Sequence, residues 1–223
     1  MQRTIVFDVN ETLLDLGPVR IWFLERFRDQ PDASTWFSEL LRISFVSSIL
    51  DRYRSFPELA AAALATSAER CGTSIEEGDI SHIGGVFTTL PAHPDVTEGL
   101  DTLLNAGFAI TALTNSPQET AEHQLRNAGI ADRFDEIMSV EMVRRFKPHA
   151  SVYCAAARRL GVDTSDVVMV AAHDWDVAGA MATGCDGVFV SRPGQIYSPS
   201  FDPPTMTAPD IANAATRIIT HYT

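Results

Sequence analysis

The stretch Thr4-Ile5-Val6-Phe7-Asp8-Val9-Asn10-Glu11-Thr12-Leu13 decides the fold of this chain. Its first half is an apolar, β-branched run that ends in an acid, which is typical of a buried strand in a parallel sheet. Asp8 then lies at the carboxyl end of the strand, where the loops of open α/β sheets form a ligand crevice. A carboxylate at that place is a candidate nucleophile. An isolated Asp after a strand can equally cap a turn or a helix, so its role depends on the rest of the chain.

Three more stretches carry polar side chains where predicted elements begin or end. Leu113-Thr114-Asn115-Ser116 closes a second apolar run, Lys147-Pro148 opens a helix, and Ala171-Ala172-His173-Asp174-Trp175-Asp176 follows a third run. Together with the FDxNxT pattern they resemble the four ordered motifs of the haloacid dehalogenase superfamily: a nucleophilic Asp, a Ser or Thr after a second strand, a Lys, and a terminal acid. Each motif alone is a weak signal, and their order and spacing along nearly the whole chain carry the resemblance.

The size and charge of the chain limit its partners. The 223 residues (24.4 kDa) suffice for one sizeable domain or for a core with an insert. A net charge of −12 and a pI near 4.8 argue against nucleic acid and anionic membranes, because both require basic patches. No apolar run approaches the roughly 20 residues that span a bilayer and no signal peptide precedes the first strand, so we expect a cytoplasmic protein. The widely spaced Cys71, Cys154 and Cys185 predict thiols rather than disulfides or a zinc site.

Residues 16–87 are predicted to form a helical cap domain over the mouth of the sheet. Pro18 can begin a helix that ends at Pro31-Asp32. Amphipathic spacing predicts three more helices, at about 34–53, at 57–70 and at about 74–87.

Residues 1–15 and 88–223 are predicted to form the core domain. Further strands are expected at 108–113, 134–140, 166–170 and 187–191, and helices at 95–105, 118–127, 148–160, 177–183 and 210–219. The segment 192–209 is predicted to be mostly loop. Strands that alternate with helices predict an α/β fold with a doubly wound parallel sheet, and the resemblance implies a Rossmann-like core.

Two positions distinguish the magnesium phosphatases of the superfamily from its metal-free hydrolases of carbon–halogen bonds. A phosphate monoester brings about two negative charges to the nucleophile, so phosphatases hold Mg²⁺ with extra acids. They also carry a second Asp, two residues after the nucleophile, that protonates the leaving group. Here that position is Asn10, and Ala171-Ala172 stand where phosphatases have Gly-Asp. A halide needs no proton, so these positions favour the metal-free branch; Asp174 keeps the phosphatase alternative open.

The motifs FDVNETLLD, LTNSP, FKP and HDWDVAGA look most like those of type II, or L-2-haloacid, dehalogenases. The resemblance implies hydrolysis of short-chain 2-haloalkanoic acids to 2-hydroxy acids with inversion at C2, without cofactor or metal. Asp8 would attack C2 to form an ester, which water then hydrolyses. Lys147 would keep Asp8 ionised, and Asp176 would be the base for the water. The alternative for Lys147 is a solvated surface lysine, and the alternative for Asp176 is the N-cap of the following helix.

Further contacts to the reacting groups follow from the same resemblance. Thr12, Thr114 and the backbone N–H groups after Asp8, such as that of Val9, are expected to bond Asp8 or the substrate carboxylate. The two threonines are also plausible as plain turn residues.

The leaving halide requires donors or positive charge on the far side of the carbon. Asn115 matches the family's Asn in the second motif, and Arg42 is the best match to its cap arginine. We expect Arg42 to point inward from a helix that is otherwise apolar on that face; a surface salt bridge is the alternative.

Tyr153, His173, Trp175 and Asn10 complete the predicted site. Tyr153 matches a family tyrosine near the site, or else packs in the core, and Trp175 would line the pocket or serve packing alone. His173 falls where some dehalogenases have Asn and others His. Asn10 replaces a common aromatic residue. A His and an Asn make a more polar pocket, which favours small substrates such as haloacetates.

A member of the fold that only binds a small acid or a protein is a third interpretation. The retention of Asp8, Lys147 and Asp176 argues against it, because a binding protein has no need of this set. The resemblance also implies a homodimer.

Overall fold

The molecule is built on a parallel sheet with the first strand in its middle. The structure is a computed structural model that describes residues 3–28 and 30–223. In these residues the strands are β1 (Thr4–Phe7), β2 (Ala109–Thr114), β3 (Glu136–Ser139), β4 (Val167–Ala171), β5 (Asp186–Val190) and β6 (Met206–Ala208). All pairings are parallel in the order β3-β2-β1-β4-β5-β6, and Thr4 pairs with Ala109 on one side and Val167 on the other. This order is that of a doubly wound Rossmann-like sheet, so the predicted fold class is confirmed.

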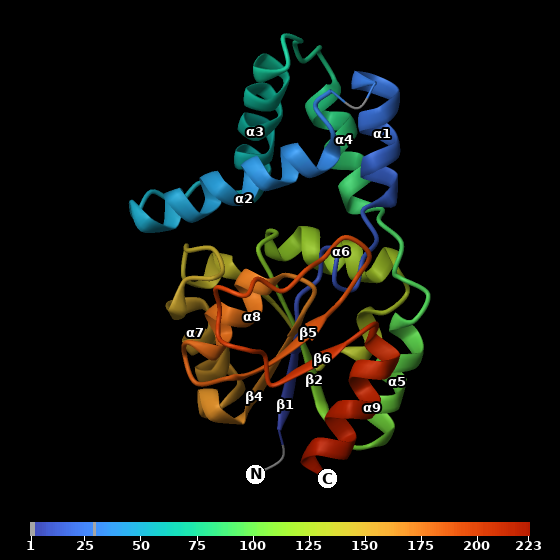
Figure 1. The fold of residues 1–223 in the computed structure, drawn as a ribbon, viewed down its shortest axis with the longest axis vertical. Helices are drawn as coiled ribbons and strands as arrows, with labels where there is room; N and C mark the ends of the chain where they lie inside the picture. Colours follow the sequence, from blue (N-terminus) through green and yellow to red (C-terminus); the bar gives the residue numbers. More distant parts are fainter. Residues whose placement is uncertain (1–2, 29) are drawn as a thin grey trace.

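Helices cover both faces of the sheet. They are α5 (Val96–Asn105), α6 (Gln118–Asn127), α7 (Ala150–Leu160), α8 (Asp174–Met181) and α9 (Ile211–Tyr222), with short 3₁₀ turns at Ala131–Arg133, Val140–Met142 and Thr164–Asp166. Figure 1 shows α7 and α8 on one side of the strands, and α5 and α9 together on the other. Because both faces are covered, β1 is buried along its whole length, which explains its uninterrupted apolar run.

Between β1 and α5 the described residues form four helices, called the cap below: α1 (Gly17–Phe27), α2 (Ala33–Ile49), α3 (Phe56–Arg70) and α4 (Asp79–Thr88). They stand together above the carboxyl ends of the strands (Figure 1). Local signals begin them: the Asp32 side chain accepts the N–H of Thr35 at 2.6 Å, and Ser55 and Glu58 form a capping box. The division into a core domain and a cap domain remains our prediction.

Several element boundaries differ from those predicted. The second cap helix ends at Ile49 rather than near residue 53, because Asp51 adopts a left-handed φ of 53°. The fourth begins at Asp79 rather than 74, after Gly78 with φ 100°. The Pro-containing segment 192–209 holds β6, whose three residues are too few for an alternating pattern to stand out.

Helix α8 begins at Asp174, three residues earlier than predicted, so the fourth motif forms its first turn. Gly179 lets this helix approach the Lys147-Pro148 segment closely. A Cβ at Gly179 would lie 2.4 Å from the Cβ of Pro148 and 3.0 Å from the hydroxyl of Tyr153. This close packing brings the third and fourth motifs together. Among the described residues, no helix is long and apolar enough to cross a membrane.

Candidate active site

Asp8 follows β1 directly, at the point where the order of the sheet reverses. Its backbone N–H continues the ladder by donating to the carbonyl of Val170, at 3.0 Å. Loops from β1, β2 and β4 therefore meet around its carboxylate, as expected for a ligand crevice at a topological switch point. The side chain is almost completely buried, so its charge depends on protein partners.

Lys147 supplies the main partner. Its ammonium group contacts Oδ1 of Asp8 at 2.7 Å and Oδ2 of Asp176 at 2.6 Å, and donates to the carbonyl of Leu113 at 2.9 Å. These three acceptors match its three N–H donors. The side chain is fully buried, so the alternative of a solvated surface lysine is wrong.

The charges of Asp8, Lys147 and Asp176 depend on one another. Burial alone would raise the pKa of Asp8, but the charge of Lys147 and the hydrogen bond from His173 outweigh it and hold this pKa well below its ordinary value. Burial alone would lower the pKa of Lys147, but Asp176 and Asp8 raise it above its ordinary value. Asp8 and Lys147 are therefore an ionised pair at neutral pH.

Asp176 lies in the first turn of α8, and the residue at its N-cap is His173, so the alternative role of Asp176 as that cap is wrong. Tyr153 donates its hydroxyl proton to Oδ1 of Asp176 at 2.6 Å, which places the predicted tyrosine beside the site. Burial raises the pKa of Asp176 against the opposing charge of Lys147. A buried carboxylate with a raised pKa is a better proton acceptor than an exposed one.

The second oxygen of Asp8 receives two other side chains. The Thr12 hydroxyl donates to Oδ2 at 2.7 Å, and Nδ1 of His173 lies 3.0 Å from the same oxygen. The other ring nitrogen of His173, Nε2, lies 3.0 Å from Oε2 of Glu11. Burial would lower the pKa of His173, but the hydrogen bonds to Asp8 and Glu11 raise it to about 10. His173 is thus a second cation at the nucleophile.

Among the described residues, the Asp8 carboxylate is bonded by Thr12, Lys147 and His173, and the other predicted residues make different bonds. The Thr114 hydroxyl accepts the N–H of Ser116 at 3.1 Å and so forms a turn, and its expected bond to the substrate carboxylate stays a prediction. Oδ1 of Asn115 accepts the N–H of Lys147 at 3.0 Å and so joins the second motif to the third. Val9 is buried in the turn after β1, where its carbonyl accepts the N–H groups of residues 13 and 14.

Asn10 was expected to make the pocket more polar, and the structure contradicts this. Its amide donates to the hydroxyl of Ser116 at 3.1 Å, and its carbonyl accepts from Gln124 at 3.2 Å. Both polar ends are therefore used to hold α6 and the second motif, and the side chain is buried.

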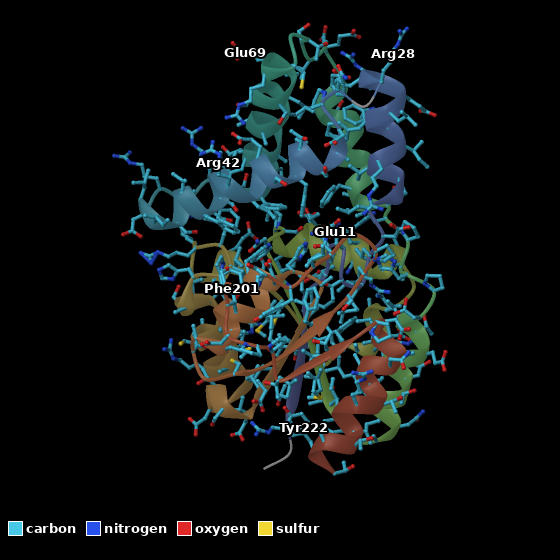
Figure 2. All side chains as sticks on the ribbon, in the orientation of Figure 1. Glu11, Arg28, Arg42, Glu69, Phe201 and Tyr222 are labelled. Atoms are coloured by element: carbon cyan, nitrogen blue, oxygen red, sulfur yellow. The ribbon has the colours of Figure 1, made fainter. Side chains whose placement is uncertain are left out.

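The expected inward orientation of Arg42 is wrong. Its guanidinium makes two hydrogen bonds to Glu39, at 2.9 and 2.7 Å, and the side chain is 57% exposed. Figure 2 shows Arg42 out along α2, apart from Glu11 at the junction of cap and core. The surface salt bridge is therefore the correct alternative. The buried face of this helix carries Trp36 and Phe37 instead.

A cleft of about 950 Å³ lies between the cap and the core, with His173 and Trp175 in its lining. Trp175 is stacked on His173 with ring centroids 5.0 Å apart, and Phe37 lies against the same imidazole at 5.9 Å. Trp175 therefore lines the pocket, as predicted. Arg42 is also among the residues that line this cleft.

Glu11 and Phe37 are site residues that the sequence analysis missed. Glu11 stands inside the FDxNxT pattern at a position that the pattern leaves open, although a charged residue between Asp8 and Thr12 was a usable signal. Phe37 carries no such signal, since one more aromatic side chain on an apolar helix is ordinary.

The donor set around Asp8 does not fit Mg²⁺. The ammonium group of Lys147 lies between the carboxylates of Asp8 and Asp176. Asp174, the acid that kept the phosphatase alternative open, accepts the N–H of Trp175 with Oδ1 and that of Ser198 with Oδ2. These positions leave Mg²⁺ without the oxygen ligands it requires beside the nucleophile.

Fold and site together define a class: enzymes with a Rossmann-like core whose reacting groups lie at strand ends, beneath a helical insert. Within that class, the chain belongs to the haloacid dehalogenase-like hydrolases, whose family model matches residues 2–184. The resemblance inferred from the four motifs is thereby confirmed.

Individual relatives agree with this family. The chain is 30% identical to (S)-2-haloacid dehalogenase 1 of Pseudomonas sp. (strain CBS-3), over 90% of this chain and 89% of that protein. It is 25% identical to haloacetate dehalogenase H-2 of Moraxella sp. (strain B), over 93% of each. Among solved structures it resembles the L-2-haloacid dehalogenase from Xanthobacter autotrophicus with chloropropionic acid covalently bound. That match has a TM-score of 0.89, 23% identity and 98% coverage of both chains, and at this identity it shows the shared fold.

Proposed function

We propose that the chain hydrolyses short-chain 2-haloalkanoic acids to 2-hydroxy acids, with inversion at C2 and without a metal. The observation that carries this proposal is the group Asp8, Lys147 and Asp176, in which a lysine lies between two carboxylates. Lys147 keeps Asp8 ionised for attack, and a halide leaving group needs no proton donor beside it. Relatives named (S)-2-haloacid and haloacetate dehalogenases support the same assignment.

In the proposed first step, one oxygen of Asp8 attacks C2 from the side opposite the halogen. A C–O bond forms, and the halide leaves with the electron pair of the C–X bond. Lys147 keeps Asp8 ionised and directed. Because in-line displacement depends on alignment, the full set of partners around Asp8 contributes by restricting its rotation.

In the second step, water attacks the Cγ of Asp8, and Asp176 accepts a proton from it. The bond between Cγ and the ester oxygen breaks, and that oxygen takes the proton back from Asp176 and leaves as the hydroxyl of the product. The configuration at C2, inverted in the first step, is unchanged here. Tyr153 and Lys147 hold the Asp176 carboxylate in place for the proton transfer.

Binding groups for the substrate follow from what the site leaves available. The amide NH₂ of Asn115 would donate to the halide, and the backbone N–H of Val9 to the substrate carboxylate. His173 and Trp175 would close the pocket against long chains, so we retain the preference for small substrates such as haloacetates. This preference now rests on the two rings and not on Asn10.

The test is chloride release from racemic 2-chloropropionate and from chloroacetate, with a chelator present. We expect release by the wild type that stops at half of the racemate, and none from Asp8→Asn. Asp15→Asn is the matched control, because it removes a carboxylate of the same loop whose partners among the described residues are Arg20, at 3.8 Å, and the N–H of Gly17.

Absence of chloride from both substrates, combined with Mg²⁺-dependent hydrolysis of phosphate esters, would replace this proposal with the phosphatase. A preference for long-chain haloacids over chloroacetate would contradict the small pocket while leaving the reaction intact.

The homodimer also remains a prediction. Ile21, Leu24 and Ile49 on the cap helices, and Leu50 directly after α2, are more than half exposed, which suits a partly apolar contact between caps. Light scattering on the eluting protein would then give twice the chain mass of 24.4 kDa. A mass of one chain would refute it.

A further inference from the structure

His173 lies between two groups that can only accept hydrogen bonds. Its Nδ1 is 3.0 Å from Oδ2 of Asp8, and its Nε2 is 3.0 Å from Oε2 of Glu11. A neutral imidazole carries a proton on only one nitrogen, so it can satisfy only one of the two carboxylates. Both contacts are satisfied together when the ring carries both protons. The rings of Phe37 and Trp175 pack against the imidazole and limit its rotation.

Glu11 is itself held in an uncommon backbone conformation. Its φ is 62°, a region that favours glycine, and a residue with a side chain occupies it at a cost of about 1 kcal/mol. Its N–H donates to the carbonyl of Leu14 at 2.9 Å, and its side chain also receives Arg20 at 3.4 Å and Gln195 at 3.3 Å. A glycine would fit this turn without strain. The carboxylate of Glu11 is therefore the feature that this position gains.

The two oxygens of Asp8 are unequally occupied. Oδ2 receives Thr12 and His173, which use both of its lone pairs, whereas among the described residues Oδ1 receives Lys147 alone. Oδ1 thus keeps a lone pair for attack on C2. Once it has formed the ester bond, Oδ2 is the carbonyl oxygen of the ester. The backbone N–H of Ala172 donates to the hydroxyl of Thr12 at 2.9 Å, which directs the hydroxyl proton towards Oδ2.

We propose that Glu11 is a positioning residue for hydrolysis of the ester: it holds His173 as a doubly protonated donor to Oδ2 of Asp8, the ester carbonyl oxygen. This inference rests on the proposed dehalogenation. When water adds to Cγ, the electron pair of the C=O bond moves to Oδ2. The N–H of His173 and the O–H of Thr12 then stabilise this oxyanion. When the carbonyl re-forms, the bond to Oδ1 breaks, its electron pair stays on Oδ1, and Oδ1 leaves as the hydroxyl of the 2-hydroxy acid with the proton that Asp176 took from water.

The effect of Glu11 falls mainly on the second step. Loss of one donor to an oxyanion lowers kcat by roughly 10²–10³-fold, and loss of only the charge of that donor lowers it less. For Glu11→Gln we expect kcat to fall about 10- to 100-fold, because the amide does not hold the second proton of His173 as a carboxylate does. Chloride release in the first turnover should stay near the wild-type rate.

The experiment combines rapid-quench chloride release from chloroacetate with intact-protein mass measurement. In Glu11→Gln we expect a burst of one chloride per active site and accumulation of the protein carrying the covalent ester. Asp15→Asn, the matched loss of charge on the same loop, should behave as the wild type. In a His173→Asn background, the addition of Glu11→Gln should have little further effect, because Glu11 acts through His173. A Glu11→Gln variant with wild-type kcat, or with a slowed burst and no ester, would overturn the proposal.

An independent measurement follows the imidazole itself. The ¹⁵N shifts of the His173 ring, assigned by their loss in His173→Asn, should report both nitrogens protonated in the wild type at pH 8 and one in Glu11→Gln. A neutral His173 in the wild type at pH 8 would also overturn the proposal, and it needs no variant of Glu11 that folds. If the wild type releases no halide, the proposed function fails and the hydrolytic step fails with it. The ring shifts would still decide whether Glu11 holds the doubly protonated imidazole.

Discussion

Two cations meet the carboxylate of Asp8, one at each oxygen, and they are held in different ways. Lys147 is fully buried, and all three of its donors are bound to protein acceptors. His173 lies at the wall of a cleft, and its charge depends on Asp8 and Glu11. One side of the nucleophile therefore carries a permanent charge, and the other carries a charge that a neighbouring side chain controls. The permanent charge of Lys147 suits a structural requirement of every turnover. The dependent charge of His173 suits a role in a single step.

The largest effect should come from removing the permanent charge with Lys147→Met. Asp8 and Asp176 would then share a buried space without a cation, and leaving buried charges unpaired costs about 3–5 kcal/mol of unfolding free energy. We expect kcat to fall by at least roughly 10³-fold, because Asp8 loses both its direction and the partner that keeps it ionised. Urea unfolding and steady-state chloride release measure the two losses. A variant with activity within tenfold of the wild type would show that His173 alone suffices.

A smaller loss of activity should follow from Tyr153→Phe, which removes one hydrogen bond to Asp176, the second carboxylate bound by Lys147. Asp176 would lose the donor at Oδ1 and keep Lys147 at Oδ2. We expect a fall in kcat of about tenfold and a loss of about 1 kcal/mol in unfolding free energy. The pH–rate profile should move to higher pH, since removal of a hydrogen bond to the charged form raises the pKa of the base. An unchanged profile would contradict the role of Asp176 as that base.

The charge of His173 should change how the unfolding free energy depends on pH. The pKa of His173 in the folded protein is raised to about 10 from an ordinary 6.5, so its contribution is complete below pH 6.5 and is lost as the pH rises towards 10. Asp8 and Glu11 face the ring directly, with Lys147 and Arg20 beyond them. Between pH 6.5 and 10 the wild type should thus lose more unfolding free energy than His173→Asn. Parallel curves for the two proteins in urea unfolding would refute the raised pKa.

The smallest effect should come from Arg42→Ala. Its guanidinium is exposed and bound to Glu39, and exposed pairs of this kind contribute less than about 1 kcal/mol. Glu39 retains Arg70 at 3.0 Å after the substitution. We expect kcat/KM for chloroacetate to stay within about twofold of the wild type, because the side chain makes no contact with Asp8. A fall of tenfold or more would require the cap to move and would restore Arg42 as a halide ligand.

How a side chain is positioned also explains whether its place could be predicted from the sequence. The placement of Asp8 follows from topology, since it directly follows β1 and residues at the carboxyl ends of parallel strands meet at one edge of the sheet. Lys147 lies beyond the end of β3 and Asp176 lies in the first turn of α8, so their roles were predicted from the resemblance, and the close approach of Gly179 to Pro148 brings their segments together. The fold class followed from the same alternation of strands and helices and is confirmed.

Residues beyond the strand ends were less predictable. The orientation of Arg42 depends on which face of α2 is buried, and a helix with apolar residues on several faces does not settle this. Asn10 forms hydrogen bonds to Ser116 and Gln124, which only the folded chain brings near. Glu11 was missed because its meaning depends on His173, 162 positions away in the sequence. In each case the missing information was the partner of a polar side chain.

Lys147 is the only lysine of the chain, and its complete burial makes it a natural reporter of unfolding. A reagent that acylates primary amines will find no lysine on the surface of the folded protein. Peptide mapping after short pulses of such a reagent would therefore count only molecules whose centre has opened, separately from any reaction at the terminal amine. Labelling of Lys147 against time then gives the free energy of opening at the active site, without introducing a probe.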